Sequence, residues 1–174
     1  MFGNELEIRL GVKSAELYKR LMDKGLTFAT AESCTAGMIS AAMGDVPGVS
    51  EVFLGGVVSY ANEVKINVLG VPEEVIKTVG AVSEKCAGYM AEGSKRVTGA
   101  DVAVSVTGIA GPGGGTKEKP VGTVCFGFAD KKGTYTETVH FGENLSRSEI
   151  RYMTAVHALE LVYDRIKYYR NKKR

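Results

Sequence analysis

An acid, a hydroxyl and a thiol stand in a row in the stretch TAESCTAGM, as Glu32, Ser33 and Cys34. The preceding LTFATA is typical of a strand, and TAGMISAAM indicates a helix from about Thr35 to Met43. A serine at such a strand-to-helix corner can cap the helix. It can also be a nucleophile, because the free N–H groups of the first helical turn would stabilise a developing oxyanion. The serine by itself leaves both roles open.

A serine nucleophile needs a base, and Lys65 is the candidate. The pattern predicts that Asn62 caps a short helix ending at Gly70, which places Lys65 in its first turn. A cation there opposes the helix dipole, so we expect a lowered lysine pKa. A shift from about 10.4 to about 7.5 takes about 4 kcal/mol. The dipole supplies at most about half of that, so desolvation must add the rest. The alternative is a surface lysine paired with Glu63 or Glu32.

Cys34 is the rival nucleophile, because a thiol near a helix N-terminus can have a lowered pKa. It can equally be a small buried residue. Since adjacent residues at a turn point to different sides, we expect Cys34 to pack beneath Ser33. Glu32 is expected to form hydrogen bonds or balance charge nearby, and a role as general acid is the weaker interpretation.

The histidines and cysteines give no sign of a metal site. His140 falls in a predicted hairpin strand and His157 inside the last predicted helix, so both are expected to be structural. The chain has two histidines and three scattered cysteines, without paired ligand spacing. We therefore expect no metal and no redox cofactor.

The loop VTGIAGPGGGTKEKPVGT, residues 106–123, is the second conspicuous feature. Its glycines allow backbone N–H groups to turn inward and bind an anion such as phosphate, although the spacing matches neither a Walker nor a Rossmann motif. A flexible hairpin lid is the alternative. Arg147 and Arg151, four residues apart at the start of the final helix, need a compensating anion there. That anion is either a ligand phosphate or the carboxylates of Glu143 and Glu149.

Predicted strands and helices alternate along the chain, which favours an α/β fold. We expect one domain over residues 1–174, a three-layer α/β/α sandwich whose mixed, mostly parallel sheet contains one antiparallel hairpin. The SRSE sequence has capping-box spacing and opens the last helix. Strands are predicted at 26–31, 52–60, 100–108, 121–130 and, after the DKKG turn, 133–141; helices are predicted at 5–24, 35–43, 62–70, 72–80, 83–99 and from 146 onward.

The ends of the first three strands are where we expect a ligand site, because open α/β sheets bind ligands at the carboxyl ends of parallel strands. If these strands are parallel, three groups of side chains meet there. The groups are Glu32-Ser33-Cys34, Tyr60-Ala61-Asn62 and Thr107-Gly108.

Composition and charge are those of a globular protein with an unusual tail. The 174 residues carry a formal net charge of +2, and six basic side chains lie in the last ten residues, RIKYYRNKKR. Nucleic-acid contact by this basic tail (about 165–174) is one interpretation, but no recognition module accompanies it, so a solvated helix end is favoured. No run of residues is apolar and long enough for a membrane span. A reduced cytoplasmic compartment fits the cysteine usage.

Four motifs together resemble the C-terminal domain of the competence/damage-inducible CinA proteins: AESCTAG, GGVVSYANEVKINVLGV, GAVSE and VTGIAGPGGGTKEKPVGTV. They occur in the same order and span nearly the whole chain. Such bacterial domains, free-standing or fused to a molybdopterin-binding-like domain, resemble nicotinamide mononucleotide (NMN) deamidases. The resemblance implies hydrolysis of the NMN carboxamide to nicotinic acid mononucleotide and ammonia.

The resemblance also implies the site residues. The Ser–Lys pair falls on Ser33 and Lys65, and Tyr60 and Thr107 lie in matching motifs, where they orient the pair or bind substrate. A homo-oligomer with no cofactor is implied. A non-catalytic nucleotide-binding module and a Cys34 amidase are the alternatives. Around the catalytic residues Ser33, Lys65 and Tyr60, the expected substrate-binding residues are Thr35, Asn62, Thr107, Gly108, Gly111, Gly113, Gly114, Arg147 and Arg151.

Overall fold

Helices and strands alternate in the computed structural model, which describes residues 2–169. The first half of the chain forms α1 (Phe2–Lys24), β1 (Phe28–Glu32), α2 (Met38–Gly44), the 3₁₀ helix η1 (Val49–Glu51), β2 (Phe53–Val58), α3 (Asn62–Asn67) and α4 (Glu73–Thr78). The second half forms α5 (Glu84–Thr98), β3 (Val102–Gly108), β4 (Thr123–Asp130), β5 (Gly133–His140) and α6 (Arg147–Arg165). Of the predicted basic tail, residues 170–174 lie outside the described residues.

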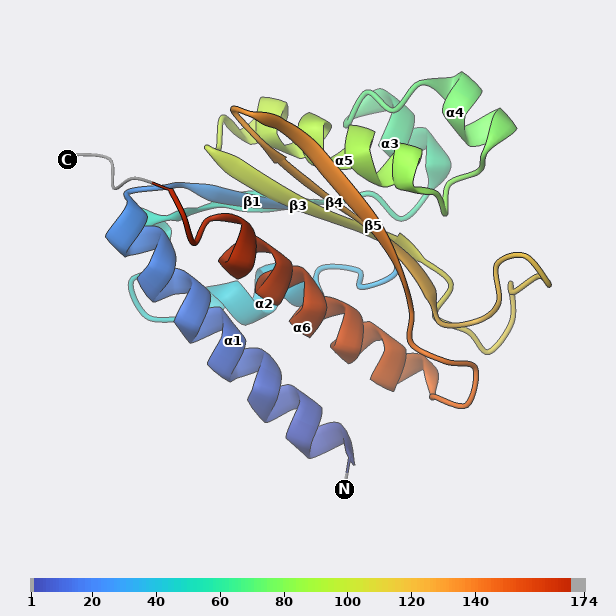
Figure 1. Cartoon of the computed structure of the whole chain (residues 1–174), viewed down its shortest axis with the longest axis horizontal. Helices are drawn as coiled ribbons and strands as arrows, with labels where there is room; N and C mark the ends of the chain where they lie inside the picture. The colour runs from blue at the N-terminus through green and yellow to red at the C-terminus, as the bar shows by residue number, and fades with distance from the viewer. Residues whose placement is uncertain (1, 170–174) are drawn as a thin grey trace.

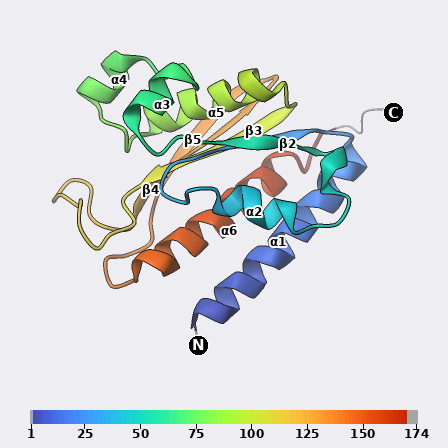
Figure 2. The same ribbon diagram turned by 180° about the vertical axis from the view of Figure 1, so that it is seen from behind.

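The five strands form one sheet in the order β2-β1-β3-β4-β5. β1 pairs parallel with β2 and β3, whereas β4 pairs antiparallel with β3 and β5. All strands except β4 therefore run in the same direction. Helices α1, α2 and α6 cover one face, and α3, α4 and α5 cover the other, as Figures 1 and 2 show from opposite sides. The predicted α/β/α sandwich with a mixed, mostly parallel sheet and a hairpin is confirmed.

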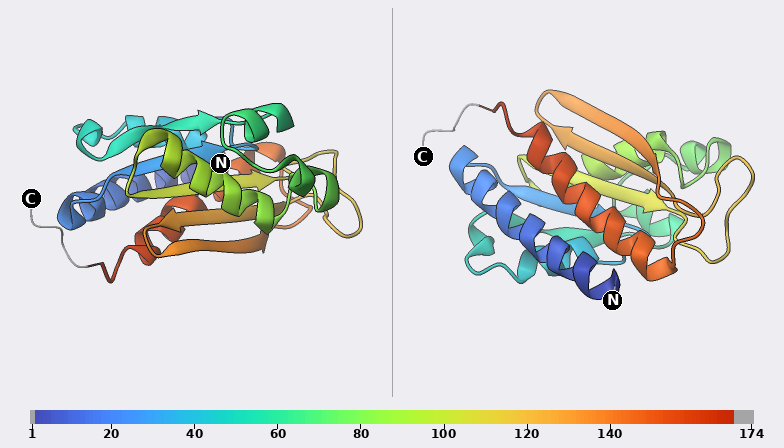
Figure 3. Two further views of the ribbon diagram at one scale, coloured as in Figure 1. Left: turned by 90° about the horizontal axis from the view of Figure 1, so that it is seen from above. Right: turned by 60° about the horizontal axis from the view of Figure 1, so that its bottom comes forward.

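The main apolar core lies between the sheet and the α1/α2/α6 layer. The helical spacing of leucines in α1 buries Leu17 and Leu21, and Ile150 and Leu159 of α6 are equally inaccessible. They pack with Phe126 of β4 in one cluster. α1 and α6 run side by side across this face of the sheet (Figure 3). Among the described helices, none is long and apolar enough to cross a membrane.

The predicted buried strand at 52–60 is wrong in its environment, because β2 is at the edge of the sheet. Its residues alternate between half-buried and exposed, and Leu54 and Val58 are exposed. Gly56 within this run is explained by close packing, because a Cβ atom there would collide with the hydroxyls of Thr30 and Ser40. A glycine is needed for β2 to lie this close to the β1–α2 corner.

The corner after β1 is longer than predicted, since α2 begins at Met38 and not near Thr35. Ser33 is therefore not the residue that caps this helix. Residues 34–37 form a turn in which Ala36 has a φ of 52° and the N-cap Gly37 a φ of 93°. The turn leaves Ser33 between the end of β1 and the helix.

The predicted caps of α5 and α6 are confirmed. The Ser83 side chain accepts a hydrogen bond from the N–H of Cys86. Ser146 and Glu149 form a reciprocal capping box at the start of α6. This box fixes the start of α6, and the first two turns of the helix present Arg147 and Arg151 to the carboxyl ends of the parallel strands.

Candidate active site

The carboxyl ends of β1, β2 and β3 lie together at one end of the sheet, where the strands finish; this end is called the carboxyl edge below. The N–H of Ser33 donates to the Val106 carbonyl of β3 at 3.0 Å, and the N–H of Ser59 donates to the Glu32 carbonyl at 2.8 Å. β1 lies between the other two strands, and the connections that follow β1 and β2 pass over opposite faces of the sheet. Such a change of direction is the usual ligand position in an open α/β sheet. Ser33 stands there.

Lys65 of α3 reaches Ser33 across this edge. Its Nζ lies 3.0 Å from the Oγ of Ser33, 2.7 Å from the carbonyl oxygen of Ser59 and 3.2 Å from that of Tyr60. Lys65 is 1% exposed and Ser33 is 9% exposed. An ammonium group has three N–H donors, so these contacts occupy all of them. Lys65 and Ser33, the two residues that the sequence analysis paired, are therefore in contact in the structure.

Burial lowers the pKa of Lys65 below its usual value of 10.5 and outweighs nearby Cys86 and Cys34, which act in the opposite direction. Among the described residues, no carboxylate lies within 4.0 Å of Nζ to hold a charge there. Desolvation of an amine without a counter-ion favours the neutral form, which is the form a general base needs.

The prediction that the helix dipole helps to lower the pKa of Lys65 is wrong. Ala61 and not Asn62 is the N-cap of α3, and Asn62 is its exposed first residue. Because α3 has only six residues, Lys65 lies in its last turn, where the dipole favours a cation. Desolvation alone accounts for the lowered pKa.

The Glu32 carboxylate holds the loop that follows Ser33. Its Oε2 accepts from the N–H groups of Gly37 and Ile39, each at 3.0 Å, and from the Thr35 hydroxyl at 2.7 Å. Its Oε1 accepts from the N–H of Ser40 at 2.8 Å and from the Ser40 hydroxyl at 2.7 Å. Glu32 is fully buried. The expected hydrogen-bonding role of Glu32 is confirmed, and Lys65 is not its partner.

Cys34 packs beneath the corner, as expected from its place next to Ser33. It is 6% exposed, and burial raises the pKa of its thiol to about 12. A thiol with so high a pKa is almost entirely protonated at neutral pH and is a poor nucleophile.

Arg147 links two parts of the carboxyl edge. One N–H group of its guanidinium donates to the carbonyl of Gly111 at 2.8 Å, and another donates to the Tyr60 hydroxyl at 3.0 Å. Both acceptors are neutral, and Arg147 remains exposed. Tyr60 is 57% exposed. Arg147 and Tyr60 are therefore an accessible pair with one positive charge, linked to the Ser33–Lys65 pair through the Tyr60 carbonyl that Lys65 contacts.

Arg151 lies one turn further along α6 and contacts the backbone after Ser33. Its Nε donates to the Cys34 carbonyl at 3.1 Å, and a terminal N–H donates to the Thr35 carbonyl at 2.8 Å. Thr35 itself is buried, and its hydroxyl donates to Glu32. Arg151 and Thr35 were both predicted to bind substrate, and in the structure both side chains hold the turn that follows Ser33.

The strand end at Thr107 and Gly108 connects to a segment that the sequence pattern did not single out as part of the site. The Thr107 hydroxyl donates to the carbonyl of Ala81 at 2.9 Å. The Lys119 ammonium donates to the carbonyls of Val79 and Val82 at 2.8 and 2.7 Å. The Gly-rich loop is thus bound to residues 79–82, between α4 and α5. The GAVSE motif, residues 80–84, overlaps this segment and was the sequence signal that could have identified it.

The glycines of this loop differ in their surroundings. A Cβ at Gly108 would press against Val124 of β4, so this glycine is explained by strand packing. Gly113 and Gly114 are exposed and line an open hollow of about 510 Å³ with Lys117 and other residues of the loop. The hollow is also lined by Pro112, which follows Gly111 in the chain, and Arg147 donates to the Gly111 carbonyl.

The histidines have structural partners, as expected. His140 Nδ1 lies 3.1 Å from the Thr123 hydroxyl, and His157 Nε2 lies 2.6 Å from Glu137. Within residues 2–169, no cluster of three histidine, cysteine or acidic side chains could hold a metal ion.

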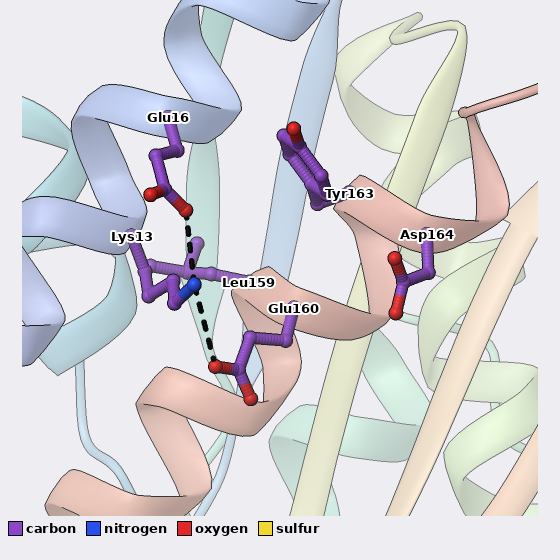
Figure 4. A pocket seen from close by; sticks show the side chains of 6 residues that line it. All are labelled: Lys13, Glu16, Leu159, Glu160, Tyr163 and Asp164. Carbon is purple, nitrogen blue, oxygen red and sulfur yellow. Dashed lines mark hydrogen bonds and ion pairs between the residues drawn. The ribbon is translucent and has the colours of Figure 1, made fainter.

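A separate hollow of about 220 Å³ lies between α1 and α6 (Figure 4). Lys13 in it is paired with Glu16 at 2.9 Å and Glu160 at 3.7 Å. These charges satisfy one another, and the hollow contains none of the predicted site residues.

Comparison with known proteins agrees with this arrangement. Residues 12–166 match the family model described as the CinA C-terminal domain. The chain is 50% identical over 149 residues to a "CinA-like protein" of Thermotoga maritima, an alignment covering 85% of this chain and 36% of the relative. A "CinA-like protein" of Synechocystis is 50% identical over 141 residues, covering 80% and 34%. The chain thus spans about a third of the length of these curated relatives.

Solved structures of similar proteins have the same fold. A competence/damage inducible protein CihA from Agrobacterium tumefaciens is 39% identical with a TM-score of 0.86, covering 90% of this chain and 94% of that one. The competence damage-inducible protein A (ComA) from Klebsiella pneumoniae is 32% identical with a TM-score of 0.88, covering 92% and 99%.

Proposed function

Because the chain belongs to the CinA C-terminal domain family, we propose that it is an amidohydrolase that converts NMN and water into nicotinic acid mononucleotide and ammonia. The observation that carries the proposal is the 3.0 Å contact between the Nζ of Lys65 and the Oγ of Ser33. A buried amine without a carboxylate partner, in contact with a serine hydroxyl, is suited to nucleophilic catalysis.

The carbonyls around Lys65 orient the neutral amine. A neutral amine keeps two N–H donors, which can remain on the carbonyls of Ser59 and Tyr60 at 2.7 and 3.2 Å. Its lone pair then faces the third contact, the Ser33 Oγ at 3.0 Å, and accepts the hydroxyl proton. Deprotonation therefore turns a donor into a correctly directed base without moving the side chain.

The reaction then follows in two halves. The Oγ of Ser33 attacks the carboxamide carbon while its proton passes to Lys65, and the amide oxygen becomes an oxyanion. Lys65 returns the proton to the leaving nitrogen as the C–N bond breaks, which releases ammonia and leaves an ester on Ser33. Water attacks this ester with Lys65 as base, the carboxylate product leaves, and Ser33 regains its proton.

The nucleotide portion of the substrate has a complementary surface in the exposed guanidinium of Arg147, which has only neutral acceptors on Tyr60 and Gly111. A phosphate would bind such a guanidinium more strongly than a carbonyl does, because both partners are then charged. The hollow beside Gly113 and Gly114 is adjacent. Direct substrate contacts of Asn62, Thr107 and Gly108, a homo-oligomer and a cytoplasmic location stay predictions.

The alternative of a cysteine amidase is disfavoured by the burial of Cys34 and by its pKa of about 12. A non-catalytic nucleotide-binding module would keep the same edge of the sheet without turnover. The cysteine amidase differs from the proposal in the activity of single variants, and the binding module differs from it in the activity of the wild type.

The test incubates the purified protein with NMN and measures nicotinic acid mononucleotide by chromatography. Wild type and Cys34→Ala should form the acid, and Ser33→Ala and Lys65→Met should not. Activity lost only in Cys34→Ala would support the cysteine amidase. Calorimetric binding of NMN without ammonia release at any pH would support the binding module.

A further inference from the structure

Ser33 and the turn that follows it, residues 34–37, are held from three directions. The sheet holds its start through the Ser33 N–H bond to Val106, at 3.0 Å. The Glu32 carboxylate holds its far end through Gly37, at 3.0 Å. Arg151 holds its middle through two carbonyls. Within the turn, Ala36 has a φ of 52° and is the one non-glycine residue with positive φ among those described. A strained residue of this kind persists only where the surroundings enforce it.

Arg151 determines the direction of a particular amide group. Its Nε binds the Cys34 carbonyl, which belongs to the same peptide unit as the Thr35 N–H. The C=O and N–H of a trans peptide point in opposite directions, so the Thr35 N–H points away from α6. The Ala36 N–H is bonded to the Ser33 carbonyl at 3.1 Å, whereas the Thr35 N–H has no acceptor among the described residues. The Thr35 N–H is thus a buried donor without a partner among residues 2–169, two residues from Ser33 along the chain.

The charge of Arg151 also acts on this amide. Arg151 has no carboxylate within 4.0 Å among residues 2–169, so its charge is not cancelled locally. A cation bonded to a carbonyl polarises the whole peptide unit and makes its N–H a stronger donor. The two contacts, at 3.1 and 2.8 Å, come from one planar guanidinium, a fork that lysine cannot reproduce.

We propose that Arg151 is a positioning residue that fixes and polarises the 34–35 peptide so that the Thr35 N–H stabilises the oxyanion formed when Ser33 attacks. The inference rests on the proposed function for the identity of the nucleophile. It replaces the sequence-based prediction of a phosphate contact by Arg151, since the guanidinium is engaged by two backbone carbonyls.

The first experiment compares NMN hydrolysis by wild type, Arg151→Lys, Arg151→Met and the control Arg9→Met, which removes an exposed arginine of α1. Loss of an oxyanion donor lowers kcat by about 100-fold or more, so Arg151→Met should show a kcat loss of that order. Its KM should change less than about threefold, because the donor acts mainly in the transition state. Arg151→Lys should retain part of the rate, and Arg9→Met should match wild type.

The pH dependence separates this role from an effect on the base. Since Lys65 does not contact Arg151, the midpoint of the pH–rate profile of Arg151→Met should equal that of wild type while the plateau falls. A moved midpoint would overturn the inference, as would an unchanged kcat with a raised KM, which is the result expected of a phosphate ligand. If Arg151→Met does not fold, the kcat of folded Arg151→Lys decides in the same way.

A second measurement does not depend on NMN as substrate. A fluorophosphonate probe reacts with an activated serine by forming an Oγ–P bond while fluoride leaves and the serine proton passes to Lys65. Intact-mass analysis gives the labelling rate, which should also fall about 100-fold in Arg151→Met. Labelling of wild type without NMN hydrolysis would reject the substrate and leave the inference standing. Equal labelling of both proteins would reject the inference, and no labelling of wild type together with no hydrolysis would reject both.

Discussion

Replacing Glu32 by glutamine tests the anchor beneath the proposed nucleophile. A glutamine side chain fits the same volume but has a single acceptor oxygen. That oxygen can keep the Oε2 partners, the N–H groups of Gly37 and Ile39 at 3.0 Å and the Thr35 hydroxyl at 2.7 Å. The new amide N–H₂ then faces the N–H of Ser40, which now contacts Oε1 at 2.8 Å. Two donors meet, so the Ser40 N–H loses its partner.

The expected magnitude follows from these contacts. A buried N–H without a partner costs about 1–3 kcal/mol, and each bond that remains weakens by roughly 1 kcal/mol when its acceptor becomes neutral. Three bonds remain and one N–H loses its partner, so we expect Glu32→Gln to lower the free energy of unfolding by about 4–6 kcal/mol. For a domain of this size, that lowers Tm by about 8–24 °C.

Urea denaturation followed by circular dichroism measures this change. The midpoint should fall while the slope m stays constant, because the unfolded surface is the same. Glu63→Gln is the matched control, an exposed glutamate of α3 whose replacement should change the free energy of unfolding by less than about 0.5 kcal/mol. Equal midpoints for the two variants would refute the view that the Glu32 carboxylate holds the turn.

Three further predictions concern the residues around the pair. The folded pKa of Lys65 is lowered, so between that pKa and 10.5 the unfolded chain binds a proton that the folded chain does not. The stability of the wild type relative to Lys65→Met should therefore rise with pH across this interval and be lost as pH falls through the folded pKa. A parallel course of the two denaturation midpoints over this interval would contradict this. Cys34 should react with iodoacetamide at neutral pH only after denaturation, because it is buried and protonated; rapid alkylation of the native protein, read by mass spectrometry, would exclude the assigned burial. Gly93→Ala should destabilise the protein by about 1–3 kcal/mol, because the new Cβ meets the backbone of Leu69, whereas Gly11→Ala, with open space around it, should be neutral or stabilising by up to about 1 kcal/mol in the same urea titration.

The sequence predicted the elements that carry local signals. The capping box at Ser146, the Ser83 cap and the alternation of strands and helices are patterns of neighbouring residues, and the structure contains all of them. The contact of Ser33 with Lys65 required only that β1 and β2 be parallel and adjacent, which the pattern of crossovers favoured.

The sequence could not predict features that depend on contacts across the fold. The start of α2 is delayed because the Glu32 carboxylate binds N–H groups as far along as Ser40. The edge position of β2 depends on strand order, which an apolar run does not reveal. For Arg151, near the start of the last helix, the sequence left a ligand phosphate and the carboxylates of Glu143 and Glu149 as candidate partners, and it gave no sign of the contacts with the Cys34 and Thr35 carbonyls that the packing of α6 creates. Each of these outcomes is decided by tertiary packing.

The lowered pKa of Lys65 was expected for a partly wrong reason. A helix dipole was predicted to contribute, but α3 is short and places Lys65 in its last turn. Burial supplies the shift instead. The expected direction was right because desolvation was already required to complete the shift.

The pH dependence of kcat/KM for NMN hydrolysis tests most directly whether an uncharged Lys65 activates Ser33. This quantity reports the pKa of the essential base in the free enzyme. Above about pH 8 the phosphate of NMN is almost fully ionised, because its second pKa is about 6, so a further rise belongs to the protein. The account predicts a tenfold rise per pH unit up to a plateau, with a midpoint below 10.5, and no such rise in Lys65→Met. A rate that is flat or falls with pH over this range, or equal rates for wild type and Lys65→Met, would contradict it.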